Sequence, residues 1–533
     1  MLISKNSFWL APVAAAVILL SACGSGDSSS PSSPHTTTEQ LKANIDTVVV
    51  IYAENRSFDT LYGKFPGADG IENALKDPTL YTQLDRDDSV LPVLPDVWAI
   101  HNSPDLIQGN WGWIKGLPNR PFEITSDKVG GDPLSLAGPD LVHRFYNNQM
   151  QINGGKNNKF AAYSDAGGLS MGHYDGSSMK MWKLAQQYTL ADKFFQGTFG
   201  GSFQNHQYLV CLCTPRWAED ANFPKSRVTI LDALITAITG IPTLAVKNSL
   251  SALVAKPDYV NDRNISPELE GKYYAINTSQ PSFQPSGTPP ATADQSSVDW
   301  LLAQANGNPA ASNREATVPL PPLTESTIGD RLSEKGVSWK WYSGGWNLAL
   351  RDYATIYEAP YSFQTHHQPF NYYNRFTPKT ELGKKERVDH LKDYDDLVVD
   401  AKAGKLPQVV FYKPAGVDTQ HAGYATIRQG DEHIADLIQK LQASPQWGKM
   451  AIIVTYDENG GFFDHAKPPK GDYWGPGTRI PAIIISPFAK KGFVDHTEYD
   501  IGSIHQFISR RFGLDLLAGA RKTFGDLTNA FNF

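Results

Sequence analysis

Residues Val48 to Asp59 read VVVIYAENRSFD, and they pass from an unbroken apolar run into a carboxylate and an amide without a turn residue. A run this rich in β-branched residues predicts a strand covered on both faces, and parallel α/β sheets place ligands at the carboxyl ends of such strands. Glu54 and Asn55 are therefore candidate site residues. The alternative is that Glu54 faces solvent and Asn55 caps the next helix.

Other apolar segments predict further strands of the same sheet. They cover residues 408–412, 450–456 and 480–486, and an alternating segment covers 337–342. Helical periodicity predicts helices at 327–335, 431–443 and 501–512, the last one capped by Asp500. Strands that alternate with helices in this way predict an α/β fold with a mostly parallel central sheet flanked by helices.

The length and charge of the chain restrict its class. We expect one large catalytic domain over residues 41–533, interrupted by an inserted, cap-like region at about 215–322 that is rich in Pro, Ser, Asn and Ala. The net charge is -7 with basic and acidic residues interspersed, which argues against nucleic acid as a partner. Nothing in the sequence sets the oligomeric state.

The first 23 residues have the pattern of an export signal. A basic start is followed by an apolar run at 8–20 that is too short to span a bilayer, and then by LSAC. This ending resembles a bacterial lipobox, which implies lipidation of Cys23 and a membrane anchor on the periplasmic or cell-surface side. The alternative is an ordinary signal peptide with an incidental Cys. Residues 24–40 predict a flexible Ser/Pro/Gly/Thr stalk.

Two cysteines remain beyond Cys23. Cys211 and Cys213 lie two apart on a predicted strand, so they point to one face, and a bridge between such near neighbours would be strained. We expect buried free thiols. A metal pair is the weaker alternative, because no further Cys completes a site.

A second acidic strand end follows the strand at 450–456. Asp457 and Glu458 are followed by Gly460 and Gly461, which allow a close approach of backbone and ligand. Because two such ends in one parallel sheet converge, their oxygens suit Mg²⁺, Ca²⁺ or Mn²⁺. The alternative for Asp457 is a cap or turn residue. The nearby Asp464-His465 pair either supports the site or forms a surface salt bridge.

The segment FGGSFQNHQ contains a candidate nucleophile. Two glycines before Ser202 permit a tight backbone with an exposed hydroxyl, and His206 lies one helical turn further on. The alternative is a loop in which Ser202 only caps a helix.

Four histidines occur in suggestive settings. Because adjacent residues on a strand face opposite ways, His366 and His367 need a loop to share a site. Together with His143 and His421, they could stabilise a phosphate when protonated and protonate a leaving alcohol, which favours activity below neutral pH.

Five segments together resemble one family. VVVIYAENRSFDTLYG, FGGSFQNHQY, THHQPF, QHAGYA and VTYDENGGFFDH are similar to segments of the bacterial acid phosphatase and phospholipase C family of phosphoesterases, which is distantly similar to alkaline phosphatase in fold. The resemblance covers most of the chain after the stalk and weakens at 215–322. It implies an alkaline-phosphatase-like sandwich. The Ser at position 202, where the phospholipase branch tends to have Thr, places the chain nearer the acid phosphatase branch.

The resemblance also implies roles for individual residues. It implies Ser202 as nucleophile and a divalent ion such as Mg, Ca, Mn or Zn as cofactor. The ion would be held by Glu54, Asn55, Ser202, Asp457 and Glu458, and the phosphate would be surrounded by His143, His366, His367 and His421.

The expected function is therefore an exported acid phosphatase that hydrolyses phosphomonoesters through a phosphoserine. Three alternatives stay open. The first is a phospholipase C that cleaves phospholipid headgroups, and the second is a surface-anchored binding protein without catalysis. The third is a zinc hydrolase built on His366 and His367, although their spacing differs from the helical His pair of such enzymes.

Overall fold

The structure is a computed structural model that describes residues 37–98, 107–218, 251–257, 265–267, 273–287, 320–351 and 363–533. The predicted signal, Cys23 and most of the predicted stalk lie outside the described residues. The stalk boundary at residue 40 is wrong, because helix α1 (Thr37–Asn44) begins within it. Leu41 of this helix is buried against the rest of the domain, which explains why the chain is already folded there.

The core is an eight-stranded sheet in the order β10-β9-β11-β1-β12-β13-β4-β14. Central strand β1 pairs in parallel with β11 and β12, whereas β13 is antiparallel to both of its neighbours. Every residue of β1 and β12 is buried, as their apolar sequences require. The predicted mostly parallel sheet is confirmed. The bounds are β10 (Leu391–Lys392), β9 (Trp339–Ser343), β11 (Val409–Lys413), β1 (Thr47–Ala53), β12 (Met450–Tyr456), β13 (Ala482–Ile485), β4 (Thr189–Ala191) and β14 (Phe493–Asp495).

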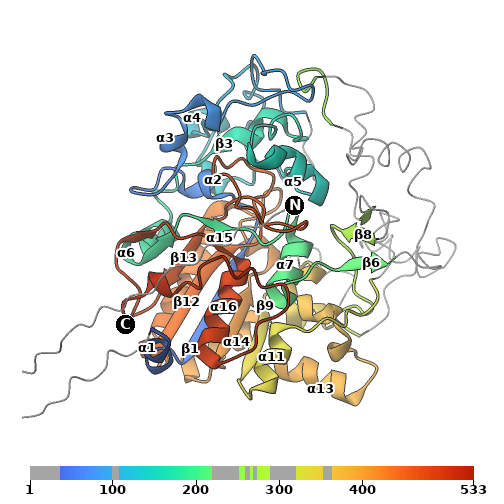
Figure 1. Cartoon of the computed structure of the whole chain (residues 1–533), viewed down its shortest axis with the longest axis vertical. Helices are drawn as coiled ribbons and strands as arrows, with labels where there is room; N and C mark the ends of the chain where they lie inside the picture. Colours follow the sequence, from blue (N-terminus) through green and yellow to red (C-terminus); the bar gives the residue numbers. More distant parts are fainter. Residues whose placement is uncertain are drawn as a thin grey trace, which may run out of the picture. The chain divides into compact units, whose positions relative to one another are not determined.

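Helices flank this sheet (Figure 1). Helix α15 contacts α6 and α14, and α16 contacts α1 and α7. The bounds are α6 (Lys180–Gln187), α7 (Ser202–Cys211), α11 (Ile328–Glu334), α14 (Tyr394–Ala403), α15 (Ile427–Gln442) and α16 (Ile501–Phe512). Helix α16 matches its predicted range and has Asp500 as cap, whereas α15 starts earlier than predicted because Thr426 caps it. None of the helices in the described part of the chain is long and apolar enough to cross a membrane.

Part of the predicted insertion forms a small antiparallel sheet. Its strands are β6 (Arg216–Ala218), β8 (Tyr273–Ile276) and β7 (Ile265–Pro267), in that order. Directly after β8, Asn277 Oδ1 accepts a hydrogen bond from Phe145 N at 2.8 Å, at the first residue of helix α5 (Phe145–Ile152). This contact ties the described end of the insertion to helix α5. The predicted amphipathic segment near 231–241 lies outside the described residues.

The two remaining cysteines form a disulfide, so the prediction of free thiols is wrong. They do not lie on a strand. Cys211 ends α7, and Leu212 has a left-handed φ of 48°, which reverses the chain. The Cα atoms of Cys211 and Cys213 are therefore 5.1 Å apart, within the range that a disulfide bridges. A strand pattern could not show this, because the turn depends on where the helix stops.

Candidate active site

The two acidic strand ends meet at one edge of the sheet. Glu54 and Asn55 follow β1, and Asp457 and Glu458 follow its parallel neighbour β12. Asp457 Oδ1 accepts hydrogen bonds from Asn55 N at 3.0 Å and from Glu458 N at 2.8 Å. The predicted convergence is confirmed, because the carboxyl ends of neighbouring parallel strands share an edge.

Neither alternative for the first strand end holds. Glu54 and Asn55 are fully buried, so Glu54 does not face solvent. The next helix, α2 (Phe58–Tyr62), is capped by Ser57 and not by Asn55. Asn55 instead has a φ of 61°, a left-handed conformation that Asn tolerates better than most residues. Gly460 packs against this turn, where a Cβ would lie 2.4 Å from Asn55 O.

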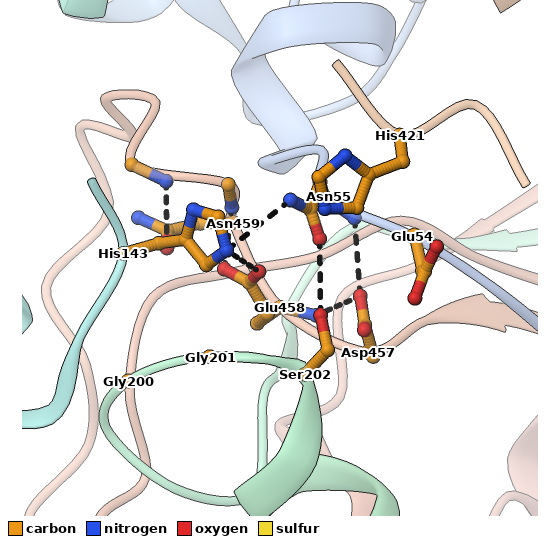
Figure 2. A network of polar contacts seen from close by, with 12 residues as sticks. Glu54, Asn55, His143, Gly200, Gly201, Ser202, His421, Asp457, Glu458 and Asn459 are labelled. Carbon is orange, nitrogen blue, oxygen red and sulfur yellow. Dashed lines mark hydrogen bonds and ion pairs between the residues drawn. The ribbon is translucent and has the colours of Figure 1, made fainter. Parts of the chain in front are cut away.

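Ser202 is the first residue of α7, and Gly201 takes the cap position, so Ser202 is not a cap. Its hydroxyl donates to Asn55 Oδ1 at 3.3 Å and also hydrogen-bonds Asp457. Figure 2 shows the hydroxyl pointing from the end of α7 toward these two side chains. A Cβ at Gly201 would lie 2.8 Å from His143 O, so this close approach needs glycine. The structure therefore brings the predicted nucleophile to the acidic edge.

The oxygens beside Ser202 fit a bound cation. One oxygen of each carboxylate accepts a hydrogen bond from a backbone N–H. Glu458 Oε2 accepts from Gly460 N, and Asp457 Oδ1 accepts from Glu458 N. The other two, Asp457 Oδ2 and Glu458 Oε1, are buried without a hydrogen-bond partner among the described residues. Buried carboxylate oxygens without partners are costly unless an ion satisfies them. Glu54, His206 and Asp457 offer ligand atoms that lie within 4.8 Å of one another, and so do Glu54, His366 and His367, so carboxylates and imidazoles at this edge could hold a metal ion. The predicted ligand set of Glu54, Asn55, Ser202, Asp457 and Glu458 stays a prediction.

Glu54, Asn55, Asp457 and Glu458 together are called the acidic cage. Burial changes the pKa values of its carboxylates. Burial raises the pKa of Asp457 to about 7, and the neighbouring Glu54 charge adds to this effect while Lys413 opposes it. Burial, and then the charge of Asp457, raise the pKa of Glu458 well above its ordinary value. A cation placed between these oxygens favours their ionised forms.

Lys413 was missed by the sequence analysis. This lysine ends β11, and its Nζ lies 3.2 Å from Glu54 Oε1, with both side chains fully buried. His367 Nε2 lies 2.9 Å from the same oxygen. Burial acts to raise the pKa of Glu54, but Lys413 and then His367 hold it well below its ordinary value. The available signal was a charged residue directly after an apolar strand, the same signal that marked Glu54.

The four predicted histidines gather around this edge. A short 3₁₀ turn, Thr365–His367, lets His366 and His367 both approach Glu54 Oε1, at 3.6 and 2.9 Å. His143 Nε2 lies 3.5 Å from Glu458 Oε1, and the His143 and His421 ring centroids are 5.9 Å apart. Their predicted roles toward phosphate stay predictions.

A cavity of about 370 Å³ opens over Ser202 and is lined also by His143, His366, His421 and the inserted residues Asn277 and Thr278. Burial lowers the pKa of His421 to about 3, and it lowers the pKa of His143 and His366. Burial therefore favours the neutral form of these imidazoles when no anion is bound. An anion in the pocket would favour their charged forms.

A buried ion cluster joins helix α2, which follows β1, to the segment between β12 and β13. Arg479 donates from Nε to Asp464 Oδ1 at 2.8 Å and from Nη2 to Asp59 Oδ1 at 3.0 Å. His465 Nδ1 lies 2.7 Å from Asp59 Oδ2, and Asp59 N donates to Asp464 Oδ2 at 3.0 Å. All four side chains are buried, so the Asp464-His465 pair is not a surface salt bridge. The cluster fixes the two halves of the acidic cage relative to each other.

The cluster predicts a pH-dependent stability. Burial acts to lower the pKa of His465, but Asp59 and then Asp69 raise it from 6.5 to about 10. Because the folded state retains a proton that the unfolded state releases, the stabilisation is complete below about pH 6.5 and is lost as pH rises to about 10. We expect His465→Gln to flatten this alkaline decline in the thermal unfolding midpoint of the chelator-treated protein.

The control for this pH series is His433→Gln. His433 lies on α15, and its Nδ1 is 3.6 Å from Asp418 Oδ2, outside the cluster. This variant should keep the alkaline decline of the wild type. A decline of unchanged slope in His465→Gln would contradict the assignment of the effect to His465.

The fold and the acidic cage define an α/β protein with a candidate active site at the carboxyl edge of a mostly parallel sheet. The chain belongs to the Phosphoesterase family, whose model matches residues 45–515. It is 29% identical over 277 residues to a non-hemolytic phospholipase C of Burkholderia pseudomallei (strain K96243), covering 43% of this chain and 38% of that protein. It is also 29% identical over 244 residues to phospholipase C B of Mycobacterium tuberculosis (strain ATCC 25618 / H37Rv), covering 40% of this chain and 44% of that protein. The chain thus spans less than half the length of these relatives.

Solved structures with local similarity include a protein of the alkaline phosphatase superfamily from Vibrio parahaemolyticus. The TM-score is 0.24 at 13% identity, over 39% of this chain and 55% of that chain. Another is the lipoteichoic acid synthase LtaP from Listeria monocytogenes, with a TM-score of 0.28 at 10% identity, over 73% of this chain and 74% of that chain.

Proposed function

We propose that this chain hydrolyses phosphate esters through a phosphoserine at Ser202. Ser202 Oγ would bond to phosphorus as the ester P–O bond breaks, and the alcohol would leave with a proton. Water would then break the Oγ–P bond and release inorganic phosphate. The observation that supports this best is the serine hydroxyl in the lining of a pocket, hydrogen-bonded to Asn55 beside two carboxylate oxygens without a hydrogen-bond partner in the described part of the chain.

The chain's own residues suit the individual tasks. Asn55 Oδ1 accepts a hydrogen bond from the Ser202 hydroxyl, and this bond orients Oγ toward the pocket. His366 and His421 line the pocket and can donate N–H groups to phosphoryl oxygens, and His143, beside Ser202, can protonate the departing alcohol. A divalent ion on the cage supplies charge neutralisation and a more acidic serine hydroxyl.

Two substrate classes compete for this site. We propose phosphomonoesters first, because the nucleophile is Ser, as in the acid phosphatase branch of the resemblance. Phospholipid headgroup diesters are the second candidate, since the relatives described above are named phospholipase C. The core chemistry is the same, and the two differ in leaving group.

The deciding experiment compares hydrolysis of p-nitrophenyl phosphate with that of p-nitrophenylphosphorylcholine, from acid to neutral pH, with and without chelator. Dominant monoester turnover supports the phosphatase proposal, and preference for the choline diester moves the assignment to phospholipase C. Absence of turnover of either ester with any divalent ion would favour the non-catalytic binding protein, and Ser202→Ala protein reports the background rate.

We also propose that the protein is exported and anchored through lipidated Cys23, on the basis of the LSAC pattern. Labelled palmitate supplied to expressing cells should enter the wild-type protein and not Cys23→Ser. Equal labelling of both proteins would rule out this anchor.

A further inference from the structure

The loop that carries Ser202 is held by side-chain amides. Between β5 (Phe194–Phe195) and α7, the carbonyl oxygens of Thr198 and Gly200 each accept a hydrogen bond from Asn205 Nδ2 at 3.3 Å. The same two carbonyls accept from Gln196 Nε2, at 2.8 Å for Thr198 and 3.3 Å for Gly200. Gln196 and Asn205 are both fully buried. The two amides therefore share the Thr198 and Gly200 carbonyls, and Asn205 Nδ2 also lies 3.2 Å from the carbonyl oxygen of Gly201, the residue before Ser202.

The oxygens of these amides point to different partners. Asn205 Oδ1 accepts from Thr198 N at 3.0 Å, which closes the loop onto the first turn of α7. Gln196 Oε1 accepts from Asn459 N at 3.0 Å, and Asn459 follows the acidic pair after β12. Gln196 is thus a direct link between the serine loop and the cage loop.

We infer that Gln196 and Asn205 are positioning residues for Ser202 and act as one unit on the loop carbonyls. The inference rests on the proposed function, in which Ser202 Oγ attacks phosphorus. The loop passes through Gly200 at a φ of 92°, so it depends on these side chains for its shape. A reacting atom displaced by about 1 Å can lose about 10²-fold in rate.

The test replaces each amide by its carboxylate isostere. Asn205→Asp and Gln196→Glu keep the shape and one oxygen, but the lost NH₂ leaves an oxygen facing the Thr198 and Gly200 carbonyls. We expect kcat for p-nitrophenyl phosphate to fall about 10²-fold in each variant. The KM should stay near wild type, because neither amide lines the pocket.

The double variant separates positioning from general damage. Because both amides act on the same two carbonyls, the double variant should lose little more than the more severe single variant. If the two losses multiply, the residues do not act as a unit and the inference fails.

Gln83→Glu is the matched control. Gln83 is also fully buried, and its Nε2 donates to the loop carbonyls of Tyr81 at 2.9 Å and Asn157 at 3.1 Å, outside the pocket. This variant should lower the thermal unfolding midpoint and keep the wild-type kcat. It shows what the loss of a buried amide costs when the nucleophile is not involved.

Circular dichroism establishes whether each variant is folded. If Gln196→Glu is not folded, Gln196→Met takes its place, because it removes the donors without adding an unfavourable charge. Wild-type kcat in a folded variant would overturn the inference, as would a loss confined to KM or ion affinity. If Ser202→Ala is inactive while the amide variants keep full kcat, only this inference fails. An inactive wild type would overturn the proposed function and this inference together.

Discussion

Ser202→Ala should lower kcat for phosphate esters by at least about 10³-fold, because the proposed reaction has no first step without the attacking oxygen. The fold should persist, since among the described residues the hydroxyl, which lines the pocket, hydrogen-bonds only Asn55 and Asp457. Acid-quenched wild-type enzyme should contain a phosphoserine, and the variant should not. Steady-state kinetics and mass spectrometry of the quenched protein measure both effects.

The control for this variant is Ser486→Ala. Ser486 is also fully buried, and its hydroxyl donates to Met450 O at 2.8 Å, at the first residue of β12 and so at the opposite end of that strand from the cage. Its kcat should match the wild type. Near wild-type turnover in Ser202→Ala would refute Ser202 as the nucleophile and leave the family membership intact.

Removal of the ion, or of one of its ligands, should have the second large effect. We expect chelator to abolish activity and a divalent ion to restore it, and we expect Asp457→Asn to lower kcat/KM by at least about 10²-fold. The variant should gain less thermal stabilisation from added ion than the wild type. Its ion-free form should be at least as stable as the wild type near neutral pH, because burial already raises the pKa of Asp457 to about 7 and its charge is unfavourable there.

Asp431→Asn is the control for this series. Asp431 is a fully buried carboxylate that accepts two backbone N–H groups, from Lys180 at 2.7 Å and Met181 at 2.8 Å, much as Asp457 does. It lies on α15, outside the cage. Activity and ion binding should be unchanged. Full activity of chelator-treated wild type would show that the unsatisfied oxygens serve another purpose.

The local pattern of apolar and polar residues was sufficient to predict the central strands and several helices. Unbroken apolar runs predicted β1 and β12, because strands buried on both faces need apolar side chains at every position. Helix α16 and its Asp500 cap followed from periodicity and capping chemistry. The polar residues after β1 and β12 could be placed together before the structure, since parallel neighbours share a carboxyl edge.

Ion pairs and hydrogen bonds between distant segments could not be predicted from this local pattern. The pairing of Lys413 with Glu54, the bond from Asn459 to Gln196 and the Arg479 cluster each join segments that are far apart along the chain. The chain reversal at Leu212 that allows the Cys211–Cys213 disulfide depends on where α7 ends. None of these contacts leaves a periodic signal.

The sequence by itself therefore determined the class of fold, the family and the residue types at the acidic edge, because each depends on local hydrophobic pattern and on residues adjacent to strand ends. Only the tertiary structure decided which charges and hydrogen bonds surround each of those residues. The physical reason is that a buried polar side chain must find its partner within about 3 Å, and packing of the whole domain decides which segment supplies it.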